Sequence, residues 1–343
     1  MLNVGVIGFG YWGTNIVRNF HAVEGMQVKL ICDQSSTALS RAKKQFPFAE
    51  VTTNSIDITR NPNIDVVAVV TPMAHHYALA KDALRHGKHV FVEKPFTASE
   101  AEALDLIALA EQEQRLIMVD HTFLFTGAVR KIKALIDRKA LGDILYYDST
   151  RVNLGLFQHD CNVVWDLAPH DFSILNYLFD SAPFKLSAHG MDHFGRGLEN
   201  IAYVTMSLEN QMMANFTFNW LSPVKIRQAL IGGTEKMLVW NDLDAEEKIK
   251  IYDKGIQIDD DPQNLYKVLV DYRSGDVYSP RIEPLEALQV EVEYFRDCIL
   301  TGQQPINDGY AGLKVVQMLE AVDYSMKRQG VMVDLSESVY GRC

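Results

Sequence analysis

Three glycines, Gly8, Gly10 and Gly13, occur in the segment GFGYWG, which follows a short apolar run and precedes a helical pattern. In this context the spacing is typical of a dinucleotide-binding turn. Gly8 would allow the tight turn, Gly10 would leave room for a pyrophosphate, and Gly13 would let the helix pack closely against the strand. N–H groups at the start of the helix would then face the phosphates. The alternative is a glycine turn that only connects a strand to a helix.

A carboxylate, Asp33, stands 20 residues after Gly13, at the end of the second apolar run. A carboxylate at this distance accepts hydrogen bonds from the ribose diol of adenosine. It would repel a 2′-phosphate, because like charges about 4 Å apart cost up to about 4 kcal/mol at an effective dielectric constant near 20. We therefore expect NAD as the cofactor and weaker binding of NADP. The alternative is a solvated acid at a strand end.

Polar side chains also follow three later apolar runs, in the segments Thr71 to His76, Glu93 to Pro95 and Asp120 to His121. Ligands of open parallel sheets bind beyond the carboxyl ends of the strands. An ammonium at Lys94, beside a cationic nicotinamide ring and partly desolvated, would have a lowered pKa that suits proton transfer. A surface Lys–Glu pair explains Lys94 equally well. For His75 and His121 a structural or solvated role fits the pattern better.

Asp166 and His170 stand four residues apart in the segment WDLAPHD, at the start of an apolar helical pattern. If the helix begins near Asp166, both side chains lie on one face and Pro169 falls in the first turn, where proline is tolerated. A histidine with a carboxylate partner can act as a general base near neutral pH. Taken alone, the spacing slightly favours Asp166 as a helix cap against which His170 packs. We expect no metal site, because further ligands at suitable spacing are missing.

The elements that must position these residues are predicted from the hydrophobic pattern. Five apolar runs rich in Val and Ile alternate with helical patterns, at residues 2–7, 28–32, 65–70, 89–92 and 116–119. This alternation predicts an α/β protein with a doubly wound parallel sheet. Thr97 and Glu100 predict a capping box for a helix that ends near Gln112, and Gly87 would end the helix before it.

The hydrophobic period changes after about residue 122, and segments between residues 184 and 272 alternate polar and apolar side chains. One predicted strand has Met212, Ala214, Phe216, Phe218 and Trp220 on one face, and Met213, Asn215, Thr217 and Asn219 on the other. The pattern predicts a C-terminal α+β domain with a large open, mostly antiparallel sheet, followed by helices at 285–300 and 310–327. We expect domains at 1–122 and 123–343. An uncovered sheet face would favour a homodimer or homotetramer.

Composition narrows the class of protein. The chain has 343 residues, 48% of them hydrophobic and 22% charged, with a net charge of −11. These values indicate a folded globular protein and disfavour nucleic acid as a partner. Four separated cysteines, Cys32, Cys161, Cys298 and Cys343, predict free thiols in a reducing compartment. Without a signal-like start or a long apolar run we expect a cytoplasmic protein with no membrane partner.

These motifs resemble those of the Gfo/Idh/MocA oxidoreductases. The resemblance is carried by GFGYWG at 8–13, VVTPMAHHYALAKDALRHGKHVFVEKPFT at 69–97 and WDLAPHD at 165–171, of which the Glu-Lys-Pro signature is the most specific. It implies a Rossmann domain followed by an α/β domain with a large open sheet. Where family members often carry glycine in the last motif, this chain has Ala168 and Pro169.

The resemblance also implies roles for individual residues. The cofactor would contact Gly8, Phe9, Gly10, Tyr11, Trp12, Gly13, Asp33, Thr71, Pro72, His76, Glu93 and Lys94. Within this set Glu93 would bind a ribose of the cofactor, and Lys94 would be catalytic and would contact the nicotinamide ribose. Asp166 and His170 would form the active-site pair, with Asp166 orienting His170 or a substrate hydroxyl. Whether His170 or Lys94 accepts the proton stays open.

The segment Asp160-Cys161-Asn162 and residues 283–321 look most like the branch that acts on nucleotide-linked sugars, including dehydrogenases at C3 of UDP-N-acetylglucosamine-derived uronic acids. A diphosphate substrate would need local cations, for which the candidates are Arg151, Lys225, Arg227 and Arg281. For each of these residues a solvated surface charge is the more common role. Asn153, Asp160 and Asn162 would hydrogen-bond sugar hydroxyls, and the alternative is that they are only loop residues.

The expected function is NAD-dependent hydride transfer between nicotinamide and a ring carbon, C3, of a nucleotide-linked sugar. Three alternatives remain. The first is a dehydrogenase of inositol, another polyol or a free sugar. The second is an NAD-dependent glycosidase that works by transient oxidation, and the third is an NAD-binding sensor without turnover.

Overall fold

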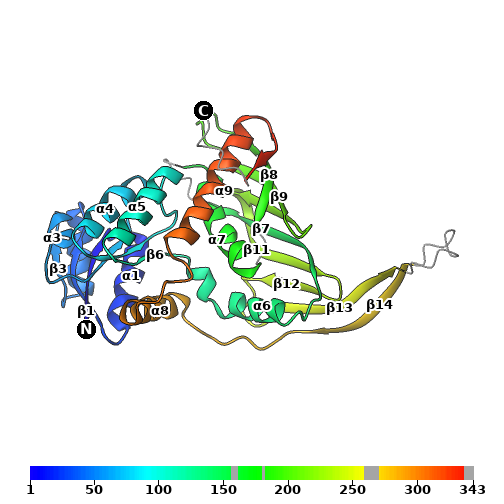
Figure 1. Ribbon diagram of the computed structural model, residues 1–343, viewed down its shortest axis with the longest axis horizontal. Coiled ribbons are helices and arrows are strands. Elements are labelled where there is room, and N and C mark those ends of the chain that lie inside the picture. The colour runs from blue at the N-terminus through cyan, green and yellow to red at the C-terminus, as the bar shows by residue number, and fades with distance from the viewer. Residues whose placement is uncertain (156–160, 180–181, 259–269, 336–343) are drawn as a thin grey trace. The chain divides into compact units, whose positions relative to one another are not determined.

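The computed structural model describes residues 1–343 except 156–160, 180–181, 259–269 and 336–343 (Figure 1). The chain divides into two compact units. The first unit contains Met1–Thr126 and Leu285–Glu320, and the second contains Gly127–Pro284 and Ala321–Cys343. The domain boundary predicted after residue 122 lies close to Thr126, and the first unit also includes the segment 285–320.

The first unit is built on a six-stranded parallel sheet in the order β3-β2-β1-β4-β5-β6. The strands are β1 (Leu2–Ile7), β2 (Met26–Cys32), β3 (Glu50–Thr52), β4 (Val66–Val69), β5 (His89–Val92) and β6 (Ile117–Val119). This doubly wound sheet confirms the predicted fold class. The strand order reverses between β1 and β4, which is where such sheets bind ligands, beyond the carboxyl ends of the strands. The sequence analysis missed β3, whose three residues are only partly buried.

Helices cover this sheet. They are α1 (Tyr11–Ala22), α2 (Ser36–Gln45), α3 (Ile56–Thr59), α4 (His76–Arg85), α5 (Glu100–Gln112) and α8 (Ala287–Thr301), with short 3₁₀ turns η1 (Met73–His75) and η2 (Thr122–Phe125). Gly87 ends α4 with φ +73°, as predicted. The predicted cap of α5 was wrong by two residues, because the box is formed by Ser99 and Glu102. The Thr97 hydroxyl instead donates to the carbonyl of Ser99 over 2.8 Å.

The second unit contains a nine-stranded sheet in the order β14-β13-β12-β11-β7-β10-β9-β8-β15. Its strands are β7 (Ile144–Leu154), β8 (Pro183–Met191), β9 (Ile201–Leu208), β10 (Met213–Asn219), β11 (Leu221–Gly233), β12 (Met237–Asn241), β13 (Ile249–Ile258), β14 (Val270–Tyr278) and β15 (Val333–Asp334). Only the pair β7–β10 runs parallel among these described strands. The prediction of a large, mostly antiparallel sheet is therefore confirmed.

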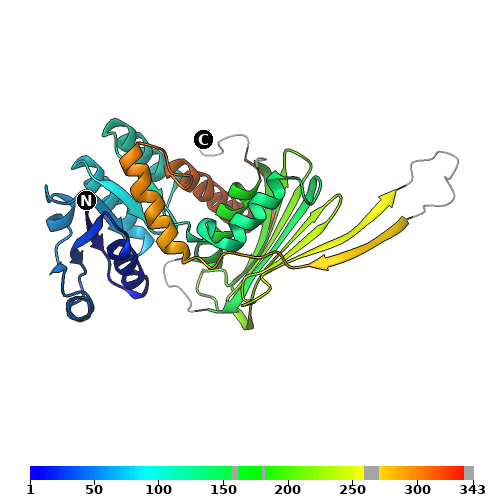
Figure 2. The same cartoon turned by 90° about the horizontal axis from the view of Figure 1, so that it is seen from below.

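Helices α6 (Gly127–Asp137) and α7 (Val163–Leu178) lie on one side of this sheet (Figure 2). On that side Phe172 of α7 packs edge-on against Phe216 of β10, with ring centroids 5.2 Å apart. The predicted alternation is confirmed, because the side chains of Met212, Ala214, Phe216, Phe218 and Trp220 are each at most 1% exposed. Burying such a face removes several hundred Å² of apolar surface from water, at roughly 25 cal/mol per Å².

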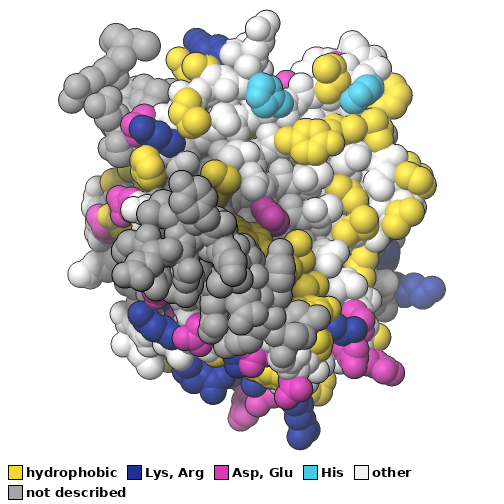
Figure 3. Space-filling model, turned by 90° about the vertical axis from the view of Figure 1, so that its right-hand side faces the viewer, with side chains coloured by type: hydrophobic (Ala, Val, Ile, Leu, Met, Phe, Trp, Pro, Cys, Tyr) yellow, Lys and Arg dark blue, Asp and Glu magenta, His cyan; other side chains and the backbone are white. Residues whose placement is uncertain are grey.

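The opposite face of the nine-stranded sheet keeps large apolar side chains exposed. Tyr203 of β9 is 56% exposed and Met213 of β10 is 49% exposed. Figure 3 views the molecule from this side, where hydrophobic side chains lie among polar ones.

The last helix, α9 (Gly309–Lys327), begins in the first unit and ends in the second. No helix in the described part of the chain is long and apolar enough to cross a bilayer. Cys32, Cys161 and Cys298 are free thiols.

Candidate functional site

The glycine turn lies at the carboxyl end of β1, and the three glycines differ in what surrounds them. Gly8 has φ +103°, and a Cβ there would lie 2.2 Å from the carbonyl oxygen of Val70. A Cβ on Gly13 would lie 2.3 Å from the carbonyl oxygen of Gly8. No protein atom lies within 4 Å of a Cβ built on Gly10. The protein's own backbone therefore requires Gly8 and Gly13, whereas the space over Gly10 is open to a ligand.

Helix α1 begins directly after Gly10 without a capping side chain and without an acidic residue in its first turn. Its first N–H groups are therefore available to an anion, as in dinucleotide-binding turns. Phe9 is fully buried and packs edge-on against Phe46, 5.9 Å between ring centroids. Tyr11 is 91% exposed. Of these two aromatic residues, Phe9 can offer a cofactor only its backbone, whereas the Tyr11 side chain remains accessible.

Asp33 lies beside this turn. Its carboxylate accepts hydrogen bonds from the N–H groups of Phe9, over 2.7 Å, and Ser35, over 2.8 Å. The guanidinium of Arg41 donates to the carbonyl of Phe9 over 2.6 Å and lies 5.3 Å from the centre of the Phe9 ring. Asp33 lies at the strand end predicted from the sequence, and Arg41, which no sequence pattern indicated, adds a cation next to the same turn.

His76 connects the ends of two strands. Its side chain is 1% exposed, with Nδ1 2.8 Å from the carbonyl oxygen of Pro95 and Nε2 2.7 Å from that of Thr71. Burial lowers the pKa of His76. Because both ring nitrogens face backbone carbonyls, His76 holds the turns after β4 and β5 together. This geometry gives His76 a positioning role, through Thr71 and the turn that carries Lys94, while its contact with the cofactor stays a prediction.

Glu93 and Lys94 follow β5, and Lys94 is joined to Pro95 by a cis peptide bond. Burial and the neighbouring Asp120 raise the pKa of Glu93 well above its usual range, although Lys94 opposes the shift. Asp120, which follows β6, is 2% exposed and accepts a hydrogen bond from Nε1 of Trp12 over 2.9 Å. The sequence analysis noted Asp120 without a role. The structure joins it to the glycine turn and to the Glu93 turn.

In the second unit, Asp166 and His170 lie one turn apart on α7, both partly buried. Nε1 of Trp220 donates to the Asp166 carboxylate over 3.0 Å. The helix begins at Val163, three residues before the expected start at Asp166, so Pro169 falls in the second turn and not in the first. There it removes one backbone hydrogen bond from the helix.

Asn162 caps α7. Its side-chain oxygen accepts from the N–H groups of Val164 and Trp165, over 3.1 and 3.2 Å, and its Nδ2 donates to Glu199 and Asp323. Asn162 therefore has a structural role at the start of α7, and its contact with a sugar hydroxyl stays a prediction. The pattern of an Asn before an apolar helix could have identified this cap. Asp160 lies outside the described residues.

Arg151 on β7 is 4% exposed, and its Nε donates to Asp171 over 2.5 Å. Asp171 is 1% exposed and also accepts from the Ser149 hydroxyl over 2.7 Å. This buried pair holds β7 to α7, so the expected contact of Arg151 with a diphosphate competes with an ion pair inside the protein. Asn153 lies further along β7, partly buried, while Lys225 and Arg281 are exposed and Arg227 lies 3.7 Å from Asp242.

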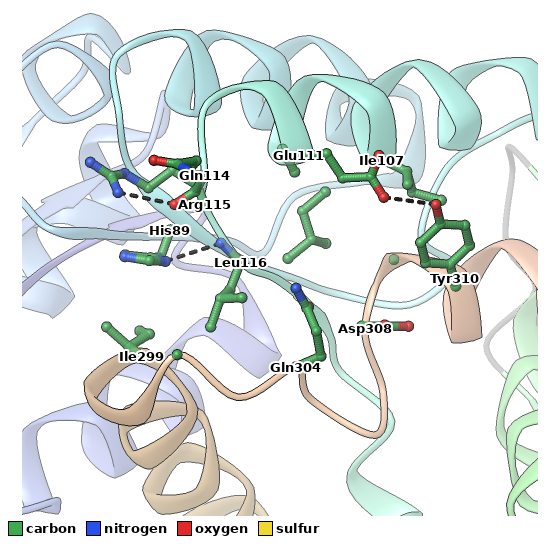
Figure 4. Close-up of a pocket in the computed structure, with 14 residues that line it drawn as sticks. His89, Ile107, Glu111, Gln114, Arg115, Leu116, Ile299, Gln304, Asp308 and Tyr310 are labelled. Carbon is green, nitrogen blue, oxygen red and sulfur yellow. Dashed lines mark hydrogen bonds between the residues drawn. The ribbon is translucent and has the colours of Figure 1, made fainter.

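A cavity of about 730 Å³ lies on the first unit, at the opposite ends of β5 and β6 from Lys94 and Asp120 (Figure 4). The figure shows His89 turned toward the N–H of Leu116, 3.1 Å away, and the Tyr310 hydroxyl toward Glu111, 2.8 Å away. Burial and the neighbouring Arg115 lower the pKa of His89 to about 4. None of the site residues predicted from the sequence lines this cavity.

Two models of known protein families match this chain, one in each unit. Residues 2–121 match "Oxidoreductase family, NAD-binding Rossmann fold", and residues 129–239 match "GFO/IDH/MocA C-terminal domain". The uncharacterized oxidoreductase YdgJ of Escherichia coli (strain K12) is 33% identical over 215 residues, which are 56% of this chain and 60% of that protein. A glycosyl hydrolase family 109 protein of Shewanella sp. (strain ANA-3) is 28% identical over 161 residues, 44% of this chain and 35% of that protein.

Solved structures share the fold over nearly the whole chain. UDP-N-acetylglucosamine 3-dehydrogenase GnnA from Acidithiobacillus ferrooxidans has a TM-score of 0.80 at 22% identity, covering 95% of this chain and 99% of that one. The scyllo-inositol dehydrogenase from Lactobacillus casei, solved with NAD(H) and scyllo-inositol, has a TM-score of 0.80 at 18% identity, covering 98% of this chain and 100% of that one.

Proposed function

Because this chain belongs to the Gfo/Idh/MocA oxidoreductase family, we propose that it is an NAD-dependent dehydrogenase that transfers hydride between the cofactor and C3 of a nucleotide-linked sugar. The main support for a dinucleotide cofactor is the glycine turn, which has open space over Gly10 and is followed by a helix start without a capping side chain. Asp33 receives the adenosine ribose beside this turn. Bound NAD supplies the hydride acceptor at C4 of its nicotinamide.

The catalytic part of the proposal assigns roles to three side chains. His170 accepts the substrate hydroxyl proton, and Asp166, one helical turn away and hydrogen-bonded by Trp220, orients it or a sugar hydroxyl. Lys94 places the reacting hydroxyl and stabilises the negative charge that develops on its oxygen. A sensor without turnover would need none of these three side chains, so their presence favours an enzyme.

The nucleotide-linked sugar is supported by the sequence around Cys161 and by residues 283–321, and GnnA is one solved relative in fold that acts on such a sugar. One observation favours a polyol or a free sugar as the alternative. Arg151, a cation expected to meet the diphosphate, is buried in an ion pair with Asp171. A small uncharged substrate would not need Arg151. A glycosidase that works by transient oxidation is the remaining enzymatic alternative, supported by similarity to family 109 proteins over the shared region.

The deciding experiment is the absorbance of reduced nicotinamide after NAD is mixed with UDP-N-acetylhexosamines, their uronic acids, inositols or simple hexoses. We expect a rise with nucleotide sugars. Lys94→Ala should lower turnover by about 10²- to 10⁴-fold while NAD still binds. Lys314→Ala, which removes an exposed lysine of α9, is the matched control. A rise with polyols alone would replace the proposed substrate, and wild-type turnover of Lys94→Ala would reject the mechanism.

We further propose a homodimer or homotetramer formed through the exposed face of the nine-stranded sheet. Tyr203 and Met213 on this face are the side chains that a second copy would cover. The free thiols Cys32, Cys161 and Cys298 suit a reducing compartment, which supports a cytoplasmic location.

A further inference from the structure

Three carboxyl groups lie in a chain at the carboxyl edge of the parallel sheet. Asp120, after β6, lies close enough to Glu93, after β5, and to Glu291 of α8 to raise the pKa of both carboxyl groups. Asp120 is 2% exposed, Glu291 is fully buried and Glu93 is partly buried. All three belong to the first unit. We refer to Glu93, Asp120 and Glu291 as the carboxyl chain.

The donors around the carboxyl chain do not satisfy three ionised groups. Asp120 accepts from Trp12 and from the N–H and hydroxyl of Thr122. Oε1 of Glu291 accepts from the N–H of His121 over 3.1 Å and from Nδ2 of Asn307 over 2.9 Å. Oε2 of Glu291 is buried and accepts no hydrogen bond from the described residues, although the Thr122 hydroxyl lies close enough to Glu291 to oppose the rise of its pKa. Since an ionised carboxylate only accepts, two touching carboxylates need a proton between them to form a hydrogen bond.

Two further titratable residues among the described ones lie beside these carboxyl groups, Lys94 next to Glu93 and His121 next to Asp120. Lys94 acts electrostatically on Glu93 and on His121. His121 is buried, and its pKa is lowered to about 3 by burial and by Lys94, so at neutral pH it brings no positive charge to the chain. Burial and Asp120 raise the pKa of Glu291 well above its usual range. Among the described residues no group of three or more His, Cys, Asp and Glu side chains is arranged to hold a metal ion.

We propose that Glu93, Asp120 and Glu291 share protons in the folded protein and that, through the hydrogen bond from Trp12 to Asp120, they make cofactor affinity depend on pH. Asp120 and Glu291 are positioning residues, because Trp12 stands between Tyr11 and Gly13 in the turn that receives the phosphates. When a shared proton leaves, the carboxyl chain gains one negative charge close to this turn, and its carboxylates repel one another. Both effects weaken the binding of an anionic dinucleotide.

The test measures NADH affinity by fluorescence from about pH 6 to about pH 9, where loss of one linked proton lowers affinity by up to about tenfold per pH unit. For the wild type we expect affinity to fall as pH rises through this range. Glu291→Gln should flatten the dependence, because its amide NH₂ donates permanently where the shared proton stood while its oxygen still accepts from His121 and Asn307. Glu293→Gln, two residues along α8 and partly exposed, is the matched control and should keep the wild-type slope.

A second measurement covers the case in which Glu291→Gln does not fold. Calorimetry of NADH binding to the wild type, in two buffers with different ionisation enthalpies, counts the protons taken up on binding. We expect uptake that increases toward alkaline pH. No proton uptake throughout the range, or a Glu291→Gln slope equal to that of the wild type, would overturn the proposal. Neither measurement needs a sugar. A failure of this proposal can therefore be distinguished from a failure of the proposed dehydrogenase activity, on which it rests for the cofactor.

Discussion

The indole N–H of Trp12 donates to the carboxylate of Asp120 over 2.9 Å, across 108 positions of the sequence. This bond joins the glycine turn after β1 to the turn after β6. His76 makes a similar connection between the turns after β4 and β5, through Thr71 and Pro95. The turns at the carboxyl edge of the sheet are therefore fixed by buried side chains before a cofactor binds, which reduces the ordering that binding must bring about.

Trp12→Phe keeps the aromatic ring and removes this N–H. A hydrogen bond to a charged group contributes about 1.5–3 kcal/mol, so we expect NADH affinity to fall by roughly tenfold or more. Trp240→Phe is the matched control, because Nε1 of Trp240 is buried in the second unit with no partner among the described residues. Equal NADH affinity in the two variants, measured by calorimetry, would show that Trp12 does not position the turn.

The glycine turn predicts opposite effects of two similar substitutions. Gly8→Ala places a methyl group 2.2 Å from the carbonyl oxygen of Val70 at a left-handed φ of +103°, so the protein should be destabilised by about 2 kcal/mol or more. Gly10→Ala meets no protein atom within 4 Å and should unfold at nearly the wild-type temperature while binding NAD more weakly. Thermal unfolding and NAD titration of both variants check this. Normal NAD affinity in Gly10→Ala would place the pyrophosphate elsewhere.

Residues whose role depends on local pattern were predictable from the sequence. The bounds of β1 and β5 agree with the apolar runs at 2–7 and 89–92. The burial of Phe216 and Phe218 follows from a period of two residues. Local patterns also located Glu93 and Lys94 just beyond a strand, because the position of a strand determines which residues lie at its carboxyl end.

Residues whose role depends on contacts between distant segments were not predictable. Glu291 reaches His121 across 170 positions, and nothing in the helical pattern around Glu291 distinguishes it from a surface acid. Arg151 was interpreted as a cation available to substrate, yet it is paired inside the protein with Asp171. A buried polar contact between distant segments produces no periodic pattern in the sequence. Such contacts therefore decide, without a local signal, which charged residues remain available for function.

Cofactor choice should depend on Asp33 together with Arg41. In Asp33→Ser the carboxylate that would repel a 2′-phosphate is gone, while Arg41, held 2.6 Å from the carbonyl of Phe9, remains near the same turn. We expect the ratio of NAD to NADP affinity to fall by at least about tenfold, since removing one like-charge contact contributes up to about 4 kcal/mol. Adding Arg41→Ala should reverse the gain for NADP. An unchanged ratio in Asp33→Ser would mean that the adenosine ribose does not lie beside Asp33.

Association through the nine-stranded sheet should be sensitive to charge on its exposed face. Tyr203→Glu places a carboxylate where the wild type has an aromatic side chain that is 56% exposed, and burying that charge in an interface would be unfavourable. We expect sedimentation to show a dimer or tetramer for the wild type and a monomer for Tyr203→Glu. Phe48→Glu, at a 40% exposed position in the first unit, should leave the assembly intact. A wild-type monomer at micromolar concentration would contradict the proposed interface.

His121 should make the protein sensitive to acid. Its side chain is 1% exposed, and neither ring nitrogen has a partner among the described residues. Its pKa falls from 6.5 to about 3 on folding, mainly through burial. The folded protein therefore binds fewer protons than the unfolded chain between these values. The associated stability is present above pH 6.5 and is lost as the pH falls from 6.5 toward 3, by up to about 1.4 kcal/mol per pH unit.

His121→Leu removes this proton site without breaking a hydrogen bond. We expect an unchanged or higher free energy of unfolding at neutral pH and a smaller loss on acidification, measured by urea denaturation at about pH 7 and about pH 5. His89→Leu is the informative comparison, because the pKa of His89 is also lowered, to about 4, yet its Nδ1 accepts from the N–H of Leu116. The His89→Leu variant should lose less stability on acidification than the wild type, but its free energy of unfolding at neutral pH should be lower. If His121→Leu is as acid-sensitive as the wild type, His121 is not buried as a neutral imidazole.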